Sequence, residues 1–390
     1  MRILVLTDDR VGPQMAGSAL RAWELARALI GAGHDVVLSG GDGSAHPEGH
    51  GPRIVRTPRW RWAEAVVAPA WCLPPRAFLG THLLVVDGIN PLLAELDASP
   101  SSSRIVRRRR TAASRLPLVA ARADAILVGG DKQAAWWSSR LSERPDVPLL
   151  QVPFGIPDAD PPDAAGRIDG VPDGWSVVLW WGGVWPWLDL ETLLAARARL
   201  GAARISVVVP TAKRPGTAFA PFSATDLMAS ARRHGLRSPQ VVALDHWIPY
   251  AERHCILNRS AIVTVLHRPG VEADLSFRTR ALDGLWAGVP LLLSEGGALA
   301  AVAHQGGWGA VVPPGDVDLA SAAMDLLLGE RSQRRCRASL EEQRDGWRWS
   351  VVVEPLVEAL PRLPASPRSG LGPAAIRAAS VLARPAKKSA

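Results

Sequence analysis

Hydrophobic residues occur in short runs along most of the chain. The runs are bounded by polar or glycine-containing segments. Short apolar runs of this kind are typical of parallel strands that are buried on both faces. We therefore expect strands at residues 3–6, 34–38, 82–86, 125–128, 176–181, 205–209, 241–244, 261–266 and 290–293.

Segments with apolar residues at helical spacing separate these runs. Leu25, Ala28, Leu29 and Ala32 share one helix face, and Gly33 ends that helix. The same reasoning predicts helices near residues 189–200, 225–235, 249–258, 277–287, 316–328 and 347–360. Strands that alternate with helices indicate an α/β fold with parallel sheets covered on both faces.

One stretch rich in Pro, Gly and Asp interrupts the alternation, which indicates a linker between two domains. The chain length of 390 residues also favours about two domains. We expect a Rossmann-like domain at 1–152, the linker at 153–174, a second Rossmann-like domain at 175–346, a crossing helix at 347–361 and a basic, disordered tail at 362–390.

The charge is unevenly distributed. Residues 1–150 carry 19 basic and 14 acidic side chains, residues 151–361 carry 20 and 23, and residues 362–390 carry six basic and none acidic. Arginine clusters at 53–61 and 104–115 favour contact with anionic lipid, or a surface that serves solubility alone. The acidic middle and the lack of a known binding motif argue against nucleic acid as the partner.

The cysteine spacing and the short apolar runs indicate a cytoplasmic protein, and the acidic motifs do not indicate a bound metal. The three cysteines lie far apart, which favours a reducing compartment. The first apolar run is too short for a signal peptide, and the longest uncharged stretch, 296–315, contains six glycines and two prolines. Asp158-Ala159-Asp160 and Asp316-Val317-Asp318 have the form of a metal-binding motif, but the first lies in the linker and the second at an expected helix start. The nine histidines show no paired ligand spacing, so we expect no metal and no cofactor.

The most informative segment is Leu266–Pro290, with the sequence LHRPGVEADLSFRTRALDGLWAGVP. A strand ends near Leu266 and a helix begins near Ser276 or Thr279, which places a helix N-terminus at the edge where parallel sheets bind phosphate. Arg278 and Arg280 add positive charge there. Asp283 shares a helix face with Thr279 and Arg280, where it either accepts hydrogen bonds from ribose hydroxyls or pairs with Arg280 on a solvated surface.

This segment resembles family 4 of the retaining GT-B glycosyltransferases, in which two glutamates with seven residues between them precede a run of small residues, glycine and proline. The second glutamate falls on Asp283, and GLWAGVP at 284–290 matches the run that follows. The first falls on Leu275, and the nearest acids are Glu272 and Asp274. Ser276-Phe277-Arg278-Thr279 stands where the family has Gly-Phe-Gly-Leu, whose backbone amides hold sugar and phosphate.

The resemblance implies further site residues, each with a structural alternative. Gly182 and Gly183 follow the first strand of the second domain, where the family has a glycine turn before a basic residue; here Leu188 and Asp189 stand in its place, and Arg278 or Arg280 compensates. Core packing is expected for Trp180 and Trp181. The other donor-side candidates are Trp185, Tyr250, Gly17, Arg21 and Glu272, and Asp87 is the acceptor-side candidate.

The resemblance therefore implies a GT-B fold, with two Rossmann-like domains facing a central cleft and a C-terminal helix that crosses back to the first domain. It implies metal-independent transfer of a sugar from a nucleotide-sugar to a hydroxyl acceptor, with retention, in bacterial polysaccharide or glycoconjugate biosynthesis. Arg278, Arg280 and Asp87 are the catalytic candidates. Two alternatives stay open: an inactive nucleotide-sugar-binding protein with the same fold, and an arginine-rich nucleic-acid-binding protein.

Overall fold

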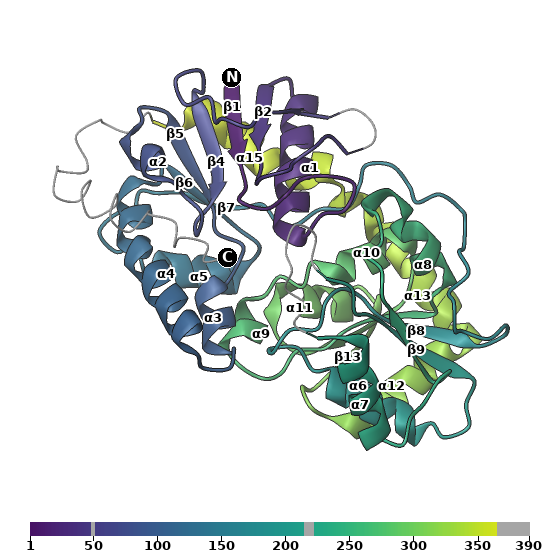
Figure 1. Cartoon of the computed structure of the whole chain (residues 1–390). Coiled ribbons are helices and arrows are strands. Elements are labelled where there is room, and N and C mark those ends of the chain that lie inside the picture. The colour runs from purple at the N-terminus through teal and green to yellow at the C-terminus, as the bar shows by residue number, and fades with distance from the viewer. Residues whose placement is uncertain (48–50, 214–221, 365–390) are drawn as a thin grey trace. The chain divides into compact units, whose positions relative to one another are not determined.

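The computed structural model describes residues 1–47, 51–213 and 222–364 (Figure 1). The predicted disordered tail lies outside the described residues from residue 365 on. The described part of the chain divides into two compact units: the first contains residues 1–12, 17–153 and 352–364, and the second contains residues 13–16 and 154–351.

The first unit is built on a seven-stranded parallel sheet. The strand order is β3-β2-β1-β4-β5-β6-β7, with β1 at Arg2–Leu6, β2 at Asp35–Ser39, β3 at Arg53–Ile54, β4 at Ala65–Pro69, β5 at Leu83–Asp87, β6 at Ala125–Val128 and β7 at Leu149–Gln151. Its helices are α1 at Gly17–Gly31, α2 at Pro75–Leu79, α3 at Leu92–Asp97, α4 at Ser103–Arg122, α5 at Asp131–Ser138 and α15 at Glu354–Ala359. The last of these packs on β7, so the C-terminal helix belongs to the first unit.

The second unit is built on a six-stranded parallel sheet. The strand order is β10-β9-β8-β11-β12-β13, with β8 at Ser176–Trp180, β9 at Ile205–Pro210, β10 at Val241–Leu244, β11 at Ile262–Val265, β12 at Leu291–Ser294 and β13 at Gly309–Val312. Its helices are α6 at Leu190–Arg199, α7 at Ala224–Arg233, α8 at Arg253–Arg259, α9 at Val271–Leu275, α10 at Arg280–Ala287, α11 at Gly297–Gln305, α12 at Val317–Leu328, α13 at Glu330–Gln343 and α14 at Trp349–Val352, with 3₁₀ turns at Tyr250–Glu252 and Arg344–Trp347.

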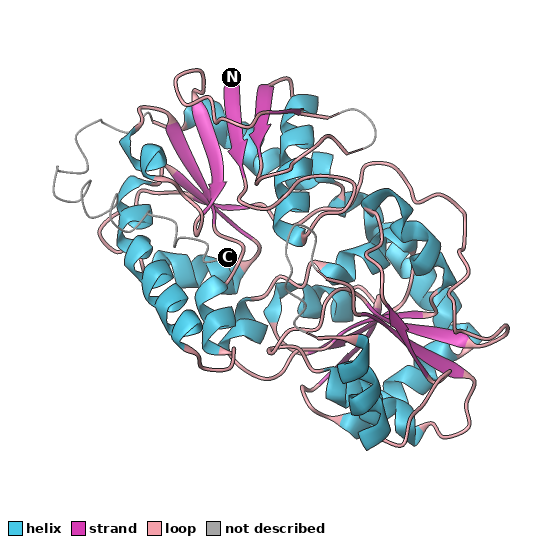
Figure 2. Ribbon diagram, viewed as in Figure 1, coloured by secondary structure: helices cyan, strands magenta, loops and turns pink. Residues whose placement is uncertain are grey.

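The inner strands of both sheets are buried on both faces, as the apolar runs predicted. In the second unit α6 packs on α7 and α12, and α10 packs on α8 and α13; Figure 2 shows the strands between these helices. The core is made of strand residues such as Val178, Val207 and Leu292, which are fully buried. Burial of apolar surface on both faces is therefore the main force that holds each sheet.

Three expectations about elements were incomplete. The sequence did not indicate β3, β4, β7 and β13. The expected single helix at 347–360 is divided into α14, α15 and flanking 3₁₀ turns, because Pro355 lacks an amide hydrogen and is accepted only in the first turn of α15. Helix α10 begins at Arg280 rather than near residue 277, since Arg278 adopts a left-handed φ of 59° that no α-helix accommodates.

Candidate functional site

The strand order of the second unit creates one position suited to ligand binding. β8 is the first strand of this unit in the chain, and it lies between β9 and β11. Chain connections therefore leave β8 toward one side of the sheet and later return on the other. In open α/β sheets, ligands bind at the carboxyl ends of the strands at such a switch point. The segments that follow β8 and β11, together with the start of α10, form the candidate site.

A glycine turn follows β8 and contacts the first residue of α10. Gly182 has a φ of 91°, a conformation that favours glycine. A Cβ atom at Gly182 would lie 2.8 Å from Nε of Arg280, so the glycine also permits the close approach of that side chain. Arg280 Nη1 donates a hydrogen bond to the carbonyl oxygen of Gly183 at 2.9 Å. The turn, the guanidinium and the start of α10 are therefore held together.

Asp283, in the first turn of α10, is bound by two donors from other segments. Its Oδ2 accepts a hydrogen bond from the indole of Trp181 at 2.7 Å, and its Oδ1 accepts one from Nε of Arg253 at 2.9 Å. The Asp283 side chain retains 22 % of its exposure, whereas that of Arg253 retains 6 %. The ion pair of Asp283 is thus made with a buried residue from α8. The sequence placed Arg253 beside Tyr250 in a segment expected either to line the base pocket or to serve a surface or packing role, and it did not indicate the pairing with Asp283.

The two tryptophans at the end of β8 differ from each other. Trp180 is buried in the core at 1 % exposure, as expected. Trp181 is only half-buried, and its indole binds Asp283, so core packing was the wrong expectation for Trp181. Side chains of successive strand residues point to opposite faces, and the sequence of two adjacent tryptophans did not show which one faces the core.

Arg278 is buried at 3 % exposure and bound by main-chain oxygens. Nη1 donates to the carbonyl oxygen of Ser294, and Nη2 donates to that of Glu295 at 2.6 Å. Burial lowers the pKa of Arg278 to about 10. The guanidinium therefore supports the end of β12, an environment that sequence reasoning did not foresee for this catalytic candidate.

Glu272 forms a buried pair with His267, the second residue after β11. Nδ1 of His267 lies 2.8 Å from Oε2 of Glu272. Burial raises the pKa of Glu272 to about 7. Burial, followed by the positive charges of Arg278 and Arg280, lowers the pKa of His267 to about 2. The sequence analysis did not select His267, although its place directly after a buried strand is a usable signal.

The remaining donor-side candidates of the second unit lie on connecting segments. Ser276 follows α9, and its Oγ accepts from the amide of Arg278 at 3.4 Å. Thr279 precedes α10 and makes no side-chain capping bond. Trp185 stacks on Trp187 with ring centroids 5.5 Å apart. The ring of Tyr250 lies 3.7 Å from the guanidinium carbon of Arg253, so Tyr250 adjoins the Asp283 pair.

In the first unit, two candidates bind each other. Nε of Arg21 donates to Oδ2 of Asp87 at 2.7 Å, and both side chains are at least nine-tenths buried. The other Arg21 nitrogens donate to the carbonyl oxygens of Val152 and Pro153. Gly17 is the first residue of α1, with no heavy atom within 4 Å of the position of a Cβ atom. The structure thus joins Arg21 and Asp87, which the sequence analysis assigned to separate roles.

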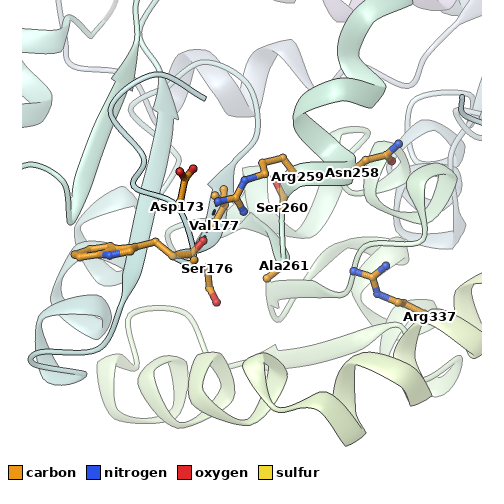
Figure 3. A pocket seen from close by; sticks show the side chains of 10 residues that line it. Asp173, Ser176, Val177, Asn258, Arg259, Ser260, Ala261 and Arg337 are labelled. Atoms are coloured by element: carbon orange, nitrogen blue, oxygen red, sulfur yellow. Dashed lines mark hydrogen bonds between the residues drawn. The ribbon is translucent and has the colours of Figure 1, made fainter. Parts of the chain in front are cut away.

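Other features of the described residues lie away from this edge. A shallow pocket of about 510 Å³ is lined at the start of β8 and before β11, the amino ends of these strands, by side chains such as Asp173, Ser176 and Arg259 (Figure 3). In the described part of the chain, no three His, Cys, Asp or Glu side chains are grouped as metal ligands. None of the described helices is long and apolar enough to cross a membrane.

Comparisons with known proteins agree on the architecture. No protein-family profile matches the sequence, and no curated protein matches it significantly. Solved structures match over nearly the whole chain: sucrose-phosphate synthase from Thermosynechococcus elongatus (16 % identity, 93 % of this chain and 99 % of that chain, TM-score 0.67), HepE of Anabaena in complex with UDP-glucose (13 %, 93 % and 100 %, 0.64) and WaaG, a glycosyltransferase involved in lipopolysaccharide biosynthesis (14 %, 93 % and 100 %, 0.61).

These likenesses establish the fold. Two parallel α/β sheets of seven and six strands match those of GT-B glycosyltransferases, which confirms the expected fold class. At identities of 16 % or less, the likeness does not extend to the activity or to membership of family 4.

Proposed function

We propose that this chain is a glycosyltransferase that transfers a sugar from a nucleotide-sugar to a hydroxyl group of a glycan, glycolipid or small natural product. One observation carries the proposal: a helix start, a glycine turn, a guanidinium and a partly exposed carboxylate meet at the carboxyl edge of the second sheet. The solved complex of HepE with UDP-glucose supports a uridine nucleotide as the first donor to test.

Each part of this edge has a role in holding the donor. The start of α10 carries partial positive charge, and Arg280 adds a full charge at the same place, which suits a diphosphate. Gly182 and Gly183 present backbone without side chains, which allows phosphate to approach closely. The partly exposed carboxylate of Asp283 accepts hydrogen bonds from ribose hydroxyls.

The chemistry follows from charge on the leaving group. The bond between the sugar C1 and the diphosphate oxygen breaks, and negative charge collects on the diphosphate. Arg280 and the start of α10 stabilise this charge, so they stabilise the transition state more than the ground state. A diphosphate oxygen takes the proton of the acceptor hydroxyl, whose oxygen bonds C1 on the same face. The anomeric configuration is retained, and the step uses no bound metal.

A binding and turnover experiment tests the proposal. The protein is screened by thermal shift with UDP-, GDP-, ADP- and dTDP-sugars, because a ligand that binds only the folded state raises the melting temperature. Release of free sugar or its transfer to an added acceptor is then measured with the donor that binds. A protein that binds the donor and releases no sugar corresponds to the inactive alternative, and a protein that binds no donor overturns the proposal.

Arg280→Ala separates catalysis from binding. We expect turnover to fall by about two to three orders of magnitude, as when other enzymes lose a hydrogen-bond donor that stabilises developing charge. Nucleotide affinity is expected to change much less. Arg334→Ala on α13, an exposed arginine with 74 % side-chain exposure, is the matched control and keeps both quantities. Equal turnover of Arg280→Ala and the parent contradicts the role of Arg280.

We also propose that α4 contacts anionic membrane. This helix carries seven arginines and no acidic residue, and Arg104, Arg107 and Arg108 are exposed. A basic residue near an anionic surface contributes about 1 kcal/mol. Flotation with phosphatidylglycerol vesicles is expected to recover the parent and to lose the triple glutamine variant of these arginines. Equal recovery of the parent with neutral and anionic vesicles contradicts membrane contact.

A further inference from the structure

We propose that Arg253 is a positioning residue, which holds the Asp283 carboxylate in the orientation that accepts hydrogen bonds from the donor ribose. This inference rests on the proposed function, in which Asp283 binds the ribose. It gives Arg253 a partner that lies 30 positions away along the chain and that the sequence pattern did not indicate.

The two oxygens of the Asp283 carboxylate are bound by donors from different segments. Arg253 donates to one oxygen and Trp181 donates to the other, so the plane of the carboxylate is fixed from two sides. Each carboxylate oxygen has two lone pairs, and one on each oxygen stays available. Two neighbouring ribose hydroxyls require two acceptor positions of this kind. The carboxylate is therefore oriented in advance and still able to bind.

Arg253 is itself held in place by its neighbours. Its guanidinium carbon lies 3.7 Å from the ring centroid of Tyr250 and 4.0 Å from that of Trp286. Its Nη1 donates to the carbonyl oxygen of Tyr250. Cation–π contacts and this hydrogen bond restrict the side chain before any ligand arrives. Because the Arg253 side chain is already restrained, less of its conformational entropy is lost when a ligand binds.

Burial of an arginine at this position is energetically costly. Arg253 is 5 % exposed, and its Nη2 has no hydrogen-bond partner among the described residues. A buried donor without a partner is unfavourable, and a buried ion pair contributes little net stability compared with apolar packing. Stability alone therefore does not account for Arg253. Orientation of the Asp283 carboxylate accounts for both its position and its pairing.

The experiment uses the difference between UDP and 2′,3′-dideoxy-UDP, which lacks both ribose hydroxyls. Dissociation constants of both nucleotides are measured by calorimetry for the parent, Arg253→Gln, Arg253→Lys and Asp283→Asn. Arg259→Gln, on the same helix but bound to the carbonyl oxygen of Trp175, is the control. The ratio of the two constants reports contacts to the ribose hydroxyls and does not respond to a uniform loss of affinity.

We expect the parent to bind UDP at least tenfold more tightly than the dideoxy analogue, and Arg259→Gln to keep this ratio. Arg253→Gln and Asp283→Asn are expected to lower the ratio at least fivefold. Arg253→Lys restores part of it, because lysine keeps the charge but lacks the planar fork. This variant also serves if Arg253→Gln does not fold.

Two different failures are distinguishable. If the parent shows the ratio, Asp283→Asn loses it and both Arg253 variants keep it, Arg253 is not a positioning residue and the proposed function stands. If the parent binds both nucleotides equally, or binds no nucleotide-sugar of the thermal-shift screen, Asp283 does not bind the ribose. The proposed role of this edge then fails, and the inference about Arg253 fails with it.

Discussion

Replacement of Arg278 distinguishes a structural role from the catalytic role that its position in the sequence predicts. Its guanidinium is buried and donates to the carbonyl oxygens of Ser294 and Glu295. Arg278→Ala removes both donors and leaves two carbonyl groups at the end of β12 without these partners. Arg278→Gly removes the same donors but suits the left-handed φ of 59°. Comparison of the two variants separates the effect of the lost side chain from the effect of the left-handed backbone conformation.

The magnitude follows from the contacts. A hydrogen bond to a charged group contributes about 1.5–3 kcal/mol, so two bonds amount to roughly 3–6 kcal/mol. The cost of burying the guanidinium, which also lowers the pKa of Arg278, offsets part of this. A net loss of about 2–4 kcal/mol is therefore expected for Arg278→Ala. Arg278→Gly is expected to be more stable than Arg278→Ala by about 1 kcal/mol, because glycine adopts positive φ without strain.

Thermal unfolding measures both effects. For a unit of roughly 200 residues, 1 kcal/mol corresponds to about 2–4 °C in melting temperature. Arg278→Ala is expected to melt about 5–15 °C below the parent, and Arg278→Gly about 2–4 °C above Arg278→Ala. Arg334→Ala controls for the loss of an arginine. If Arg278→Ala melts with the parent but loses turnover, the structural role is refuted and the catalytic role is supported.

Three further predictions concern the acidic candidates Asp87, Asp283 and Glu272. Asp87→Asn is expected to destabilise the first unit by about 3 kcal/mol, because Arg21 loses a buried partner; unchanged melting contradicts this. Asp283→Ala is expected to cost about 2–4 kcal/mol besides weakening nucleotide binding, which calorimetry and melting measure separately. The pKa of Glu272 is higher in the folded state than in the unfolded chain, so protonation of Glu272 stabilises the fold. This stabilisation is complete below pH 4.5 and is lost as the pH rises through about 7. The melting temperature of the parent minus that of Glu272→Gln is therefore expected to fall from pH 5 to pH 8. A difference that stays constant over this range contradicts the raised pKa.

The sequence predicted those strands whose burial leaves a continuous apolar run. β5 and β12 consist mostly of Leu and Val, and β10 has the same pattern. β4 was missed because alanine and proline make up three of its five residues, and these residues are also common in loops. β13 begins with Gly309 and Ala310, which have little β propensity. Its pairing with β12 is a long-range effect that no local pattern shows.

The sequence also predicted the location of the candidate site but not its internal contacts. A strand end, a glycine turn and a helix start are local features. Gly182 follows β8 and Arg280 comes after β11, and the carboxyl ends of these two parallel strands lie at one edge of the sheet. The partner of Asp283 is different in kind. Helical spacing can relate Asp283 only to residues three or four positions away, whereas Arg253 comes from another helix. The inward direction of Arg278 depends on a positive φ that residue type does not reveal.

Exposure separates the acidic candidates that the sequence treated alike. Asp87 and Asp283 each pair with a buried arginine. The Asp87 side chain is 9 % exposed, and its Oδ1 is buried without a partner among the described residues. A ligand reaches Asp87 only after rearrangement, so we infer that Asp87 acts through Arg21, which binds the carbonyl oxygens of Val152 and Pro153. Asp283 is more exposed and keeps free lone pairs. Of the two, only Asp283 has the geometry for direct contact with a substrate.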